Sequence, residues 1–105
     1  MSRMSVQRPF LVSLLREAKH HKRKALLHHA NKEQINAVSE LVMNLVKKRV
    51  PVSPKIVRTL LPYKNVLRTL SKRKQSVKAR KQLLASQEGG AFWKGLDCSH
   101  RLCHR

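Results

Sequence analysis

The sequence is poor in the residues that most catalytic and nucleotide-binding motifs need. Its 105 residues include three glycines, one tryptophan, one tyrosine, two phenylalanines and two cysteines. All three glycines lie at or after Gly89, so the preceding chain cannot form a glycine-rich phosphate loop or a dinucleotide-binding fingerprint. So few aromatic residues cannot build the stacking surfaces of single-strand-binding proteins. P-loop and Rossmann folds are therefore excluded, and the few aromatic residues argue against an RNA-recognition sheet.

Long uncharged stretches are also missing. Glu40 interrupts the best apolar run, which extends from Ile35 to Val46 and is much shorter than the roughly 20 residues that span a bilayer. The apolar run from Phe10 to Leu15 is too short for the core of a secretory signal and is followed at once by Arg16. Both cysteines lie in the last eight residues, so no disulfide can cross-link the body of the chain. We expect no transmembrane segment and a location in the nucleus or in a virion.

Positive charge is the most abundant feature of the sequence. The chain has 24 Lys and Arg against 5 Asp and Glu, which gives a formal net charge of +19. Between Glu40 and Glu88 there are 13 cations and no acid. A solvated surface normally mixes the two signs to limit self-repulsion, whereas a surface that binds a polyanion does not. We therefore predict a nucleic-acid-binding surface made by these cations: Lys47, Lys48, Arg49, Lys55, Arg58, Lys64, Arg68, Lys72, Arg73, Lys74, Lys78, Arg80 and Lys81.

The apolar residues recur with a helical period through most of the chain. We predict an all-α fold, a single small domain of five or six short helices, with a flexible N-terminus at 1–8, a basic helical domain at 9–88 and a poorly ordered tail at 89–105. The central helix is predicted from Lys32 to Lys48. Asn31 is typical of an N-cap, and the apolar residues that follow share one arc of the helix.

Prolines and serines mark the boundaries of the other helices. Pro9 suits the first position of a helix, and the polar run at 19–24 fits either a turn or an exposed stretch of helix. Ser53 and Pro54 begin the next helix as cap and first residue, and Pro62 ends or kinks it.

A strongly amphipathic helix is predicted from about Tyr63 to Lys72. Lys64, Arg68 and Lys72 form a stripe at i, i+4 and i+8, on the side away from the apolar residues. We expect the apolar side to pack and the stripe to meet anions. Ser76 then caps a final helix.

The segment after Gly89 and Gly90 shows no sustained period, and we interpret it as an appendage outside the core. Its Cys98, His100, Cys103 and His104 are zinc-ligand types, but structural zinc sites draw their ligand pairs from separated stretches. A disulfide between the two cysteines is an alternative, and an unstructured tail is the interpretation we favour.

The sequence offers no other group for a metal or for catalysis. Adjacent residues diverge by about 100° on a helix, so neither histidine pair, at 20–21 or at 28–29, can bind a metal ion as a unit. We interpret these histidines as surface groups. No nucleophile stands with a base, because no Asp precedes Asp97 and the Glu residues are isolated. We expect no enzyme activity, no cofactor and no metal.

The order of short motifs resembles a family of small basic proteins of Maverick/Polinton elements and of the adenovirus-related, adintovirus-type genomes. The similarity covers roughly residues 11 to 92 and is carried by Leu14–Leu15, Lys24–Leu27, Asn31–Glu33, Ser39–Leu41, Asn44–Leu45, Val50–Pro54, Tyr63–Asn65, the Lys/Arg run, Leu83–Leu84 and Gly89–Phe92. The resemblance implies a protein of a virus-derived mobile element, with a role in the particle as a basic core protein on the packaged genome. It brings no catalytic motif.

The resemblance also directs attention to Gly89 and Gly90. Adenovirus-type proteases cut after a Gly-Gly pair that has an aliphatic residue two positions before it, whereas this chain has Gln87 there. Two interpretations of the glycine pair stay open: proteolytic processing after Gly90, or an ordinary helix end followed by a turn. Members of the family continue past the pair with a long apolar segment, which Asp97, His100 and Arg101 interrupt here.

These observations predict non-enzymatic, sequence-independent binding of nucleic acid, with duplex DNA as the expected partner and counterion release as the driving force. The oligomeric state stays open. One alternative is a ribosomal or mitochondrial ribosomal RNA-binding protein, because the first 16 residues hold Arg3, Arg8 and Arg16 and no acid, as transit peptides do. A second alternative is a capsid-associated interaction module, whose apolar helix faces bind capsid protein while its charge faces the genome.

Overall fold

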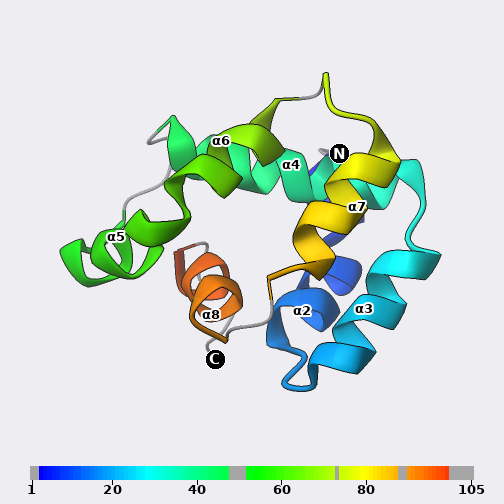
Figure 1. Cartoon of the computed structure of the whole chain (residues 1–105), viewed down its shortest axis with the longest axis horizontal. Coiled ribbons are helices and arrows are strands. Elements are labelled where there is room, and N and C mark those ends of the chain that lie inside the picture. The colour runs from blue at the N-terminus through cyan, green and yellow to red at the C-terminus, as the bar shows by residue number, and fades with distance from the viewer. Residues whose placement is uncertain (1–2, 48–51, 73, 88–89, 100–105) are drawn as a thin grey trace.

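The computed structural model of the chain describes residues 3–47, 52–72, 74–87 and 90–99, and within these ranges every regular element is helical (Figure 1). The prediction of an all-α domain is therefore confirmed. Six helices coincide with predicted ones, and α1 and α8 are additional. The elements are α1 (Arg3–Val6), α2 (Arg8–Arg16), α3 (His20–His29), α4 (Lys32–Val46), α5 (Pro54–Leu60), the 3-10 turn η1 (Leu61–Tyr63), α6 (Lys64–Ser71), α7 (Val77–Ala85) and α8 (Gly90–Ser99).

The central helix α4 begins with the predicted cap. The Asn31 side chain accepts a hydrogen bond from the Gln34 backbone N–H at 2.8 Å, and the Gln34 side chain accepts one from the Asn31 N–H at 2.9 Å. This capping box satisfies two backbone donors that have no partner inside the helix. Ile35, Leu41 and Val42 on one face of α4 are completely or almost completely buried. The helix thus presents its apolar arc to the interior, as its period predicts.

Side-chain caps also begin α5 and α7. The Ser53 hydroxyl accepts from the Ile56 N–H at 3.4 Å, with Pro54 as the first residue of α5. The Ser76 hydroxyl accepts from the Ala79 N–H at 3.0 Å at the start of α7. Pro62 lies within η1, so the break predicted at this proline is a single 3-10 turn between α5 and α6.

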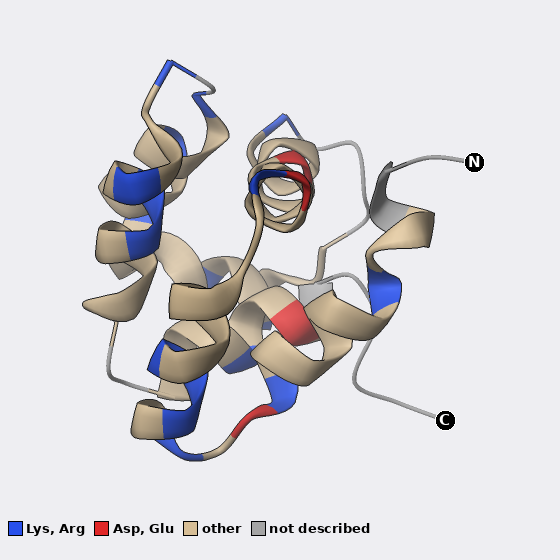
Figure 2. Ribbon diagram, turned by 90° about the vertical axis from the view of Figure 1, so that its right-hand side faces the viewer, with Lys and Arg blue, Asp and Glu red and all other residues tan. Residues whose placement is uncertain are grey.

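The polar run at 19–24 belongs mostly to α3, which settles the choice between a turn and an exposed helix. Its lysines and His21 are exposed, while Arg23 is buried. Figure 2 views the side on which α3 lies and shows Lys and Arg over most of the helices there, with Asp and Glu confined to a few short stretches. Because α3 buries few side chains, its place in the fold depends on Arg23 and Leu27.

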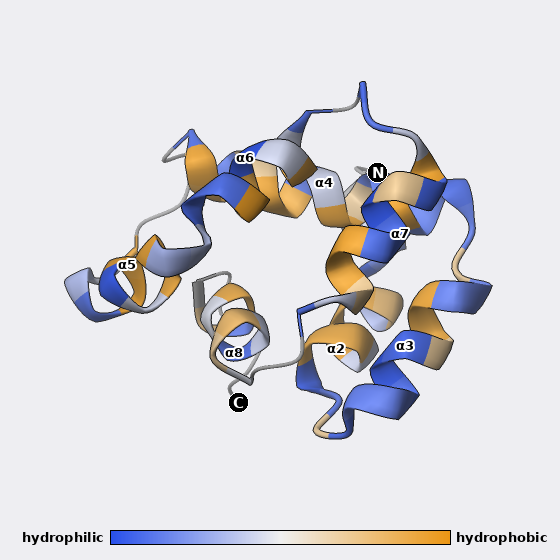
Figure 3. Cartoon of the chain, viewed as in Figure 1, coloured by the Kyte–Doolittle hydropathy of each residue, from blue (hydrophilic) through white to orange (hydrophobic). Residues whose placement is uncertain are grey.

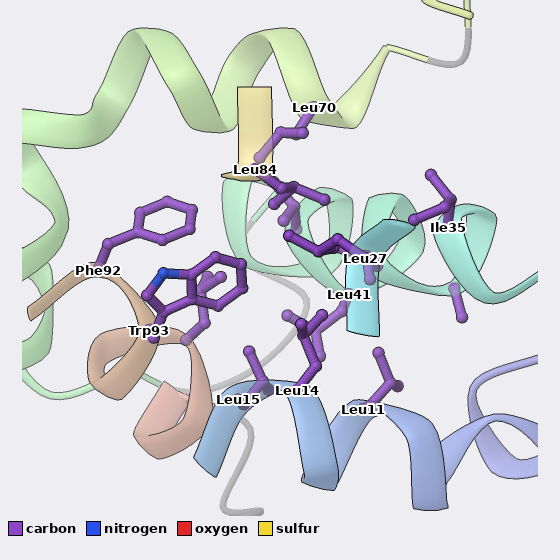
Figure 4. Packing of buried hydrophobic residues seen from close by; sticks show 14 of the residues in the cluster. Leu11, Leu14, Leu15, Leu27, Ile35, Leu41, Leu70, Leu84, Phe92 and Trp93 are labelled. Carbon is purple, nitrogen blue, oxygen red and sulfur yellow. The ribbon is translucent and has the colours of Figure 1, made fainter. Parts of the chain in front are cut away.

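The core is assembled from one side of each long helix. Figure 3 shows the hydrophobic colour of α2, α4, α7 and α8 concentrated toward the centre of the molecule. In Figure 4, leucines of α2, α3 and α7 point into the same interior as the aromatic rings of α8. Leu14, Leu70 and Leu84 have no exposed surface at all. Segments far apart in the sequence therefore share one hydrophobic cluster.

The interpretation of residues 91–105 as an appendage is wrong for the described part of that segment. Gly90–Ser99 forms α8, whose Phe92, Trp93 and Leu96 are buried in the core. The Trp93 indole N–H donates to the Gln87 carbonyl at 2.8 Å. Residues 100–105 lie outside the described residues.

A close approach of two helices explains the glycine inside α8. A Cβ atom at Gly95 would lie 2.6 Å from a methyl group of Leu60, which is itself buried under α8. Only glycine lets α8 approach α5 so closely. Among the described residues, no helix combines the length and the apolarity that crossing a membrane requires.

Candidate nucleic-acid interface

Ten of the thirteen predicted cations belong to the described residues, and eight of those ten are exposed. Lys48, Arg49 and Arg73 lie outside the described residues. The structure corrects the prediction at one position, because Arg80 is buried, while Lys81 is partly exposed. The eight exposed cations are Lys47, Lys55, Arg58, Lys64, Arg68, Lys72, Lys74 and Lys78.

The cations on and beside α6 form the stripe that the period predicts. Leu67 and Leu70 are buried on one side of the helix, while Lys64, Arg68 and Lys72 are exposed on the other. Steps of four residues place successive cations about 6 Å apart along the helix axis. A row of cations at this spacing can follow a phosphodiester backbone, in which phosphates of one strand recur every 3.4 Å along the duplex axis.

A second group of cations lies where α3 packs beside α7. The cations are Lys24 of α3 and Lys78 and Lys81 of α7, which line one shared groove together with His28. The Lys81 ammonium donates to the His28 carbonyl oxygen at 3.0 Å, which ties the two helices together. Among the described residues, no Asp or Glu belongs to this lining. The groove therefore gathers positive charge from segments about fifty residues apart in the sequence.

Sequence reasoning missed Lys24 and His28 as parts of the interface. Both stand in runs that had been assigned to the surface, so exposure was available as a signal. No signal in the sequence indicated their proximity to α7, because that proximity arises only when α3 and α7 pack together.

Arg80 has a structural role that removes it from the predicted interface. Its side chain is 3% exposed, and its Nη1 donates to the Ser39 hydroxyl at 2.7 Å. Ser39 is itself buried on α4, so the contact joins α7 to the central helix in the interior. A guanidinium held in this way cannot reach a phosphate in solvent.

Arg23 is buried in the same manner in the middle of the basic run of α3. It is 4% exposed, and its side chain donates to the backbone carbonyls of Leu14, at 3.3 Å, and Glu17. The guanidinium carbon lies 4.6 Å from the centre of the Trp93 ring. Burial lowers the pKa of Arg23 from its ordinary value, and the Glu17 carboxylate opposes that shift. Arg23 thus fastens α3 to the end of α2 and to α8.

None of the acidic residues that the structure describes belongs to α5, α6 or α7. Glu17 follows α2, Glu33 and Glu40 belong to α4, and Asp97 lies in α8. The Asp97 carboxylate is buried and lies 3.9 Å from the Arg16 guanidinium. The described parts of α5, η1, α6 and α7 contain no acid, so their exposed cations face solvent without acidic neighbours on their own helices.

The zinc-ligand types of the tail do not form a site in the described residues. Cys98 is partly buried in α8, and His100, Cys103 and His104 lie outside the described ranges. Within those ranges, no group of three or more His, Cys, Asp or Glu side chains is placed to hold a metal ion. Gly90 is exposed at the start of α8, and Gly89 lies outside the described residues.

Comparison of the chain with protein-family models, with curated proteins and with solved structures finds no match.

Proposed function

We propose that the chain binds duplex nucleic acid independently of sequence, through contacts between exposed Lys and Arg side chains and backbone phosphates. The observation that carries this proposal is the row of exposed cations on α6, on a part of the chain that holds no acid. The cations of the groove between α3 and α7 extend the positive surface. Sequence-independent binding is electrostatic in origin and is driven by release of the counterions condensed on the duplex.

The aromatic residues support a duplex rather than a single strand as the partner. Phe92 and Trp93 are buried, and Tyr63 packs edge-on against Phe92 at 5.2 Å between ring centres. Proteins that bind single strands stack exposed aromatic side chains on unpaired bases. The rings of Tyr63, Phe92 and Trp93 instead pack against one another and hold α8 in the core.

Duplex DNA is the form of nucleic acid that we propose, as a packaged genome in a virus-derived particle or in the nucleus. The support is the resemblance to basic proteins of Maverick/Polinton elements together with the absence of an exposed stacking surface on the described residues. A role on ribosomal RNA is the alternative, and it predicts tighter binding to an RNA duplex than to DNA of the same length.

The test compares two variants with the same loss of charge. One variant replaces the stripe, as Lys64→Gln, Arg68→Gln and Lys72→Gln. The control variant replaces three exposed cations of other helices and helix ends, as Arg8→Gln, Lys19→Gln and Lys32→Gln. Binding of each to labelled DNA and RNA duplexes of equal length is measured by fluorescence anisotropy at fixed salt.

If the stripe contacts phosphates, the stripe variant loses at least about tenfold in affinity for DNA, while the control loses much less. Equal losses in the two variants would show that the duplex responds only to total charge, and they would contradict a defined interface on α6. Tighter binding of the parent to RNA would favour the ribosomal alternative.

A further inference from the structure

An apolar groove lies at the end of the molecule where α4, α5 and α6 meet. Its floor includes Leu60 and Leu67, which are nearly completely buried. Its walls include Val46 at the end of α4, Val57 of α5 and Leu61 of η1. Figure 3 shows the hydrophobic colour at the end of α4 and along α5 and α6.

The groove gathers most of the exposed large apolar side chains of the described residues. Four such residues stand out, and three of them line this groove: Val46 is 38% exposed, Val57 50% and Leu61 60%. The fourth, Val6, is 56% exposed and lies elsewhere, on α1. Single exposed apolar residues are normal on a protein surface, but a contiguous group of them marks a site of interaction.

The charge around the groove defines what can occupy it. Lys64 is part of the lining, and Lys47 directly follows Val46. No Asp or Glu of the described ranges lines the groove. A second copy of this chain would bring its own +19 charge to a surface already rimmed by lysine, which opposes self-association. A flat membrane surface does not fit a concave groove, whereas one face of a helix does.

We propose that the groove binds an amphipathic, acidic helix of a partner protein. The apolar face of that helix would pack on the leucines and valines of the groove, and its acidic flank would meet Lys64 and Lys47. This is the helix-in-groove mode of recognition, in which affinity comes from apolar anchors and orientation from charge. The proposal does not depend on nucleic-acid binding, because its anchors are apolar residues outside the cationic surface, although Lys47 and Lys64 also belong to that surface.

The floor of the groove is held in place from the opposite side. The backbone of α8 at Gly95 lies directly against the Leu60 side chain. Leu60 therefore has little room to collapse inward, and the groove is preformed rather than a product of loose packing. Lys64 belongs both to the groove and to the stripe on α6, so an acidic partner bound here would reduce the charge available to phosphates.

The test uses a defined probe, a synthetic amphipathic peptide of about 18 residues with leucine at i, i+3, i+4 and i+7 and glutamate on the other positions. A peptide of the same composition in scrambled order has the same charge and no apolar face. Binding of the full chain to both labelled peptides is measured by anisotropy at about 0.15 M salt, which screens contacts between distant charges. The chain variants are Val57→Thr with Leu61→Gln, and Val6→Thr as the matched control.

We expect the amphipathic peptide to bind at least about tenfold more tightly than the scrambled one, and the groove variant to lose at least about tenfold in this affinity. The Val6→Thr control should bind like the parent. The groove variant and the Val6→Thr control should have the same thermal unfolding transition and the same affinity for duplex DNA as the parent, because the changed residues are exposed and uncharged.

Equal binding of the two peptides, or equal losses in the groove variant and the control, would overturn the proposal. A dimer of the parent that the groove variant abolishes would also overturn it and would assign the groove to a second copy. Duplex binding is read separately in the same variants, so failure of the groove proposal is distinguishable from failure of the nucleic-acid proposal.

Discussion

Arginine occupies two opposite environments in this chain, the interior and the stripe of α6. Arg23 and Arg80 are almost fully buried, and each joins helices through hydrogen bonds to fixed partners. Arg68 stands exposed among lysines on the outer face of α6. The comparison shows that a count of positive residues overstates the exposed positive surface, because part of the positive charge lies in the interior.

The two environments differ in what a substitution removes. A buried guanidinium satisfies carbonyl or hydroxyl groups that water cannot reach, so its removal leaves those groups unpaired. An exposed cation in a field of like charges contributes little to stability and is available to a ligand. Substitution of an interior arginine should therefore lower the stability of the fold. Substitution of an exposed arginine should lower the affinity for nucleic acid.

The largest effect is expected when the chain ends at Gly90. This change removes Phe92, Trp93 and Leu96 from the core and takes away the ring against which Arg23 stacks. Loss of three buried side chains of this size exceeds the net stability of a small domain. Circular dichroism should show no cooperative thermal transition. Proteolytic processing after Gly90 would have the same consequence, and a truncated chain that unfolds like the parent would contradict the place of α8 in the core.

A smaller loss is expected from Arg23→Ala. The substitution leaves the carbonyls of Leu14 and Glu17 without their donor and removes the contact with Trp93. We expect the free energy of unfolding to fall by about 3 kcal/mol. Chemical denaturation measures this, with Lys22→Ala on the same helix as the exposed control. Equal stability of the two variants would mean that Arg23 does not fasten α3 to the core.

Arg80→Ala and Lys78→Ala compare the two environments within a single helix. Each removes one positive charge from α7, but Arg80 is buried against Ser39 while Lys78 is exposed in the groove with α3. We expect Arg80→Ala to lower the free energy of unfolding by about 2 kcal/mol, and Lys78→Ala to change it by less than about 0.5 kcal/mol. Duplex affinity should fall for Lys78→Ala. A loss of stability in Lys78→Ala and a loss of duplex affinity in Arg80→Ala would contradict the roles that we assign to the two residues.

The helix boundaries were largely predictable, because local chemistry determines them. Asn31 with Gln34, Ser53 with Pro54, and Ser76 all act as the caps that their types predict. The stripe of α6 was predictable for the same reason, since the helical period places its cations on the side opposite its leucines. Elements with a strong local signal needed no information from the rest of the chain.

The rest depended on contacts between distant segments. Arg80 and Lys81 are neighbours in a basic run, and the packing of α7 on α4, where Arg80 contacts Ser39 at a separation of 41 residues, makes one of them an interior residue. The helix α8 was missed because Gly90 and Gly95 weaken its helical signal, although Gly95 is what allows the close approach to Leu60. Neither fact can be derived from composition or period.

The most direct measurement of the central claim is the dependence of duplex affinity on salt. For the parent, the logarithm of the binding constant should fall with the logarithm of the salt concentration with a slope of about −5 to −9, as for about 6 to 10 phosphate contacts. Lys64→Gln, Arg68→Gln and Lys72→Gln together should make that slope shallower by about 2 to 3, whereas the Arg8, Lys19 and Lys32 control should leave it nearly unchanged. A parent slope near zero, or the same slope in the parent and the stripe variant, would contradict phosphate binding by the exposed cations of α6.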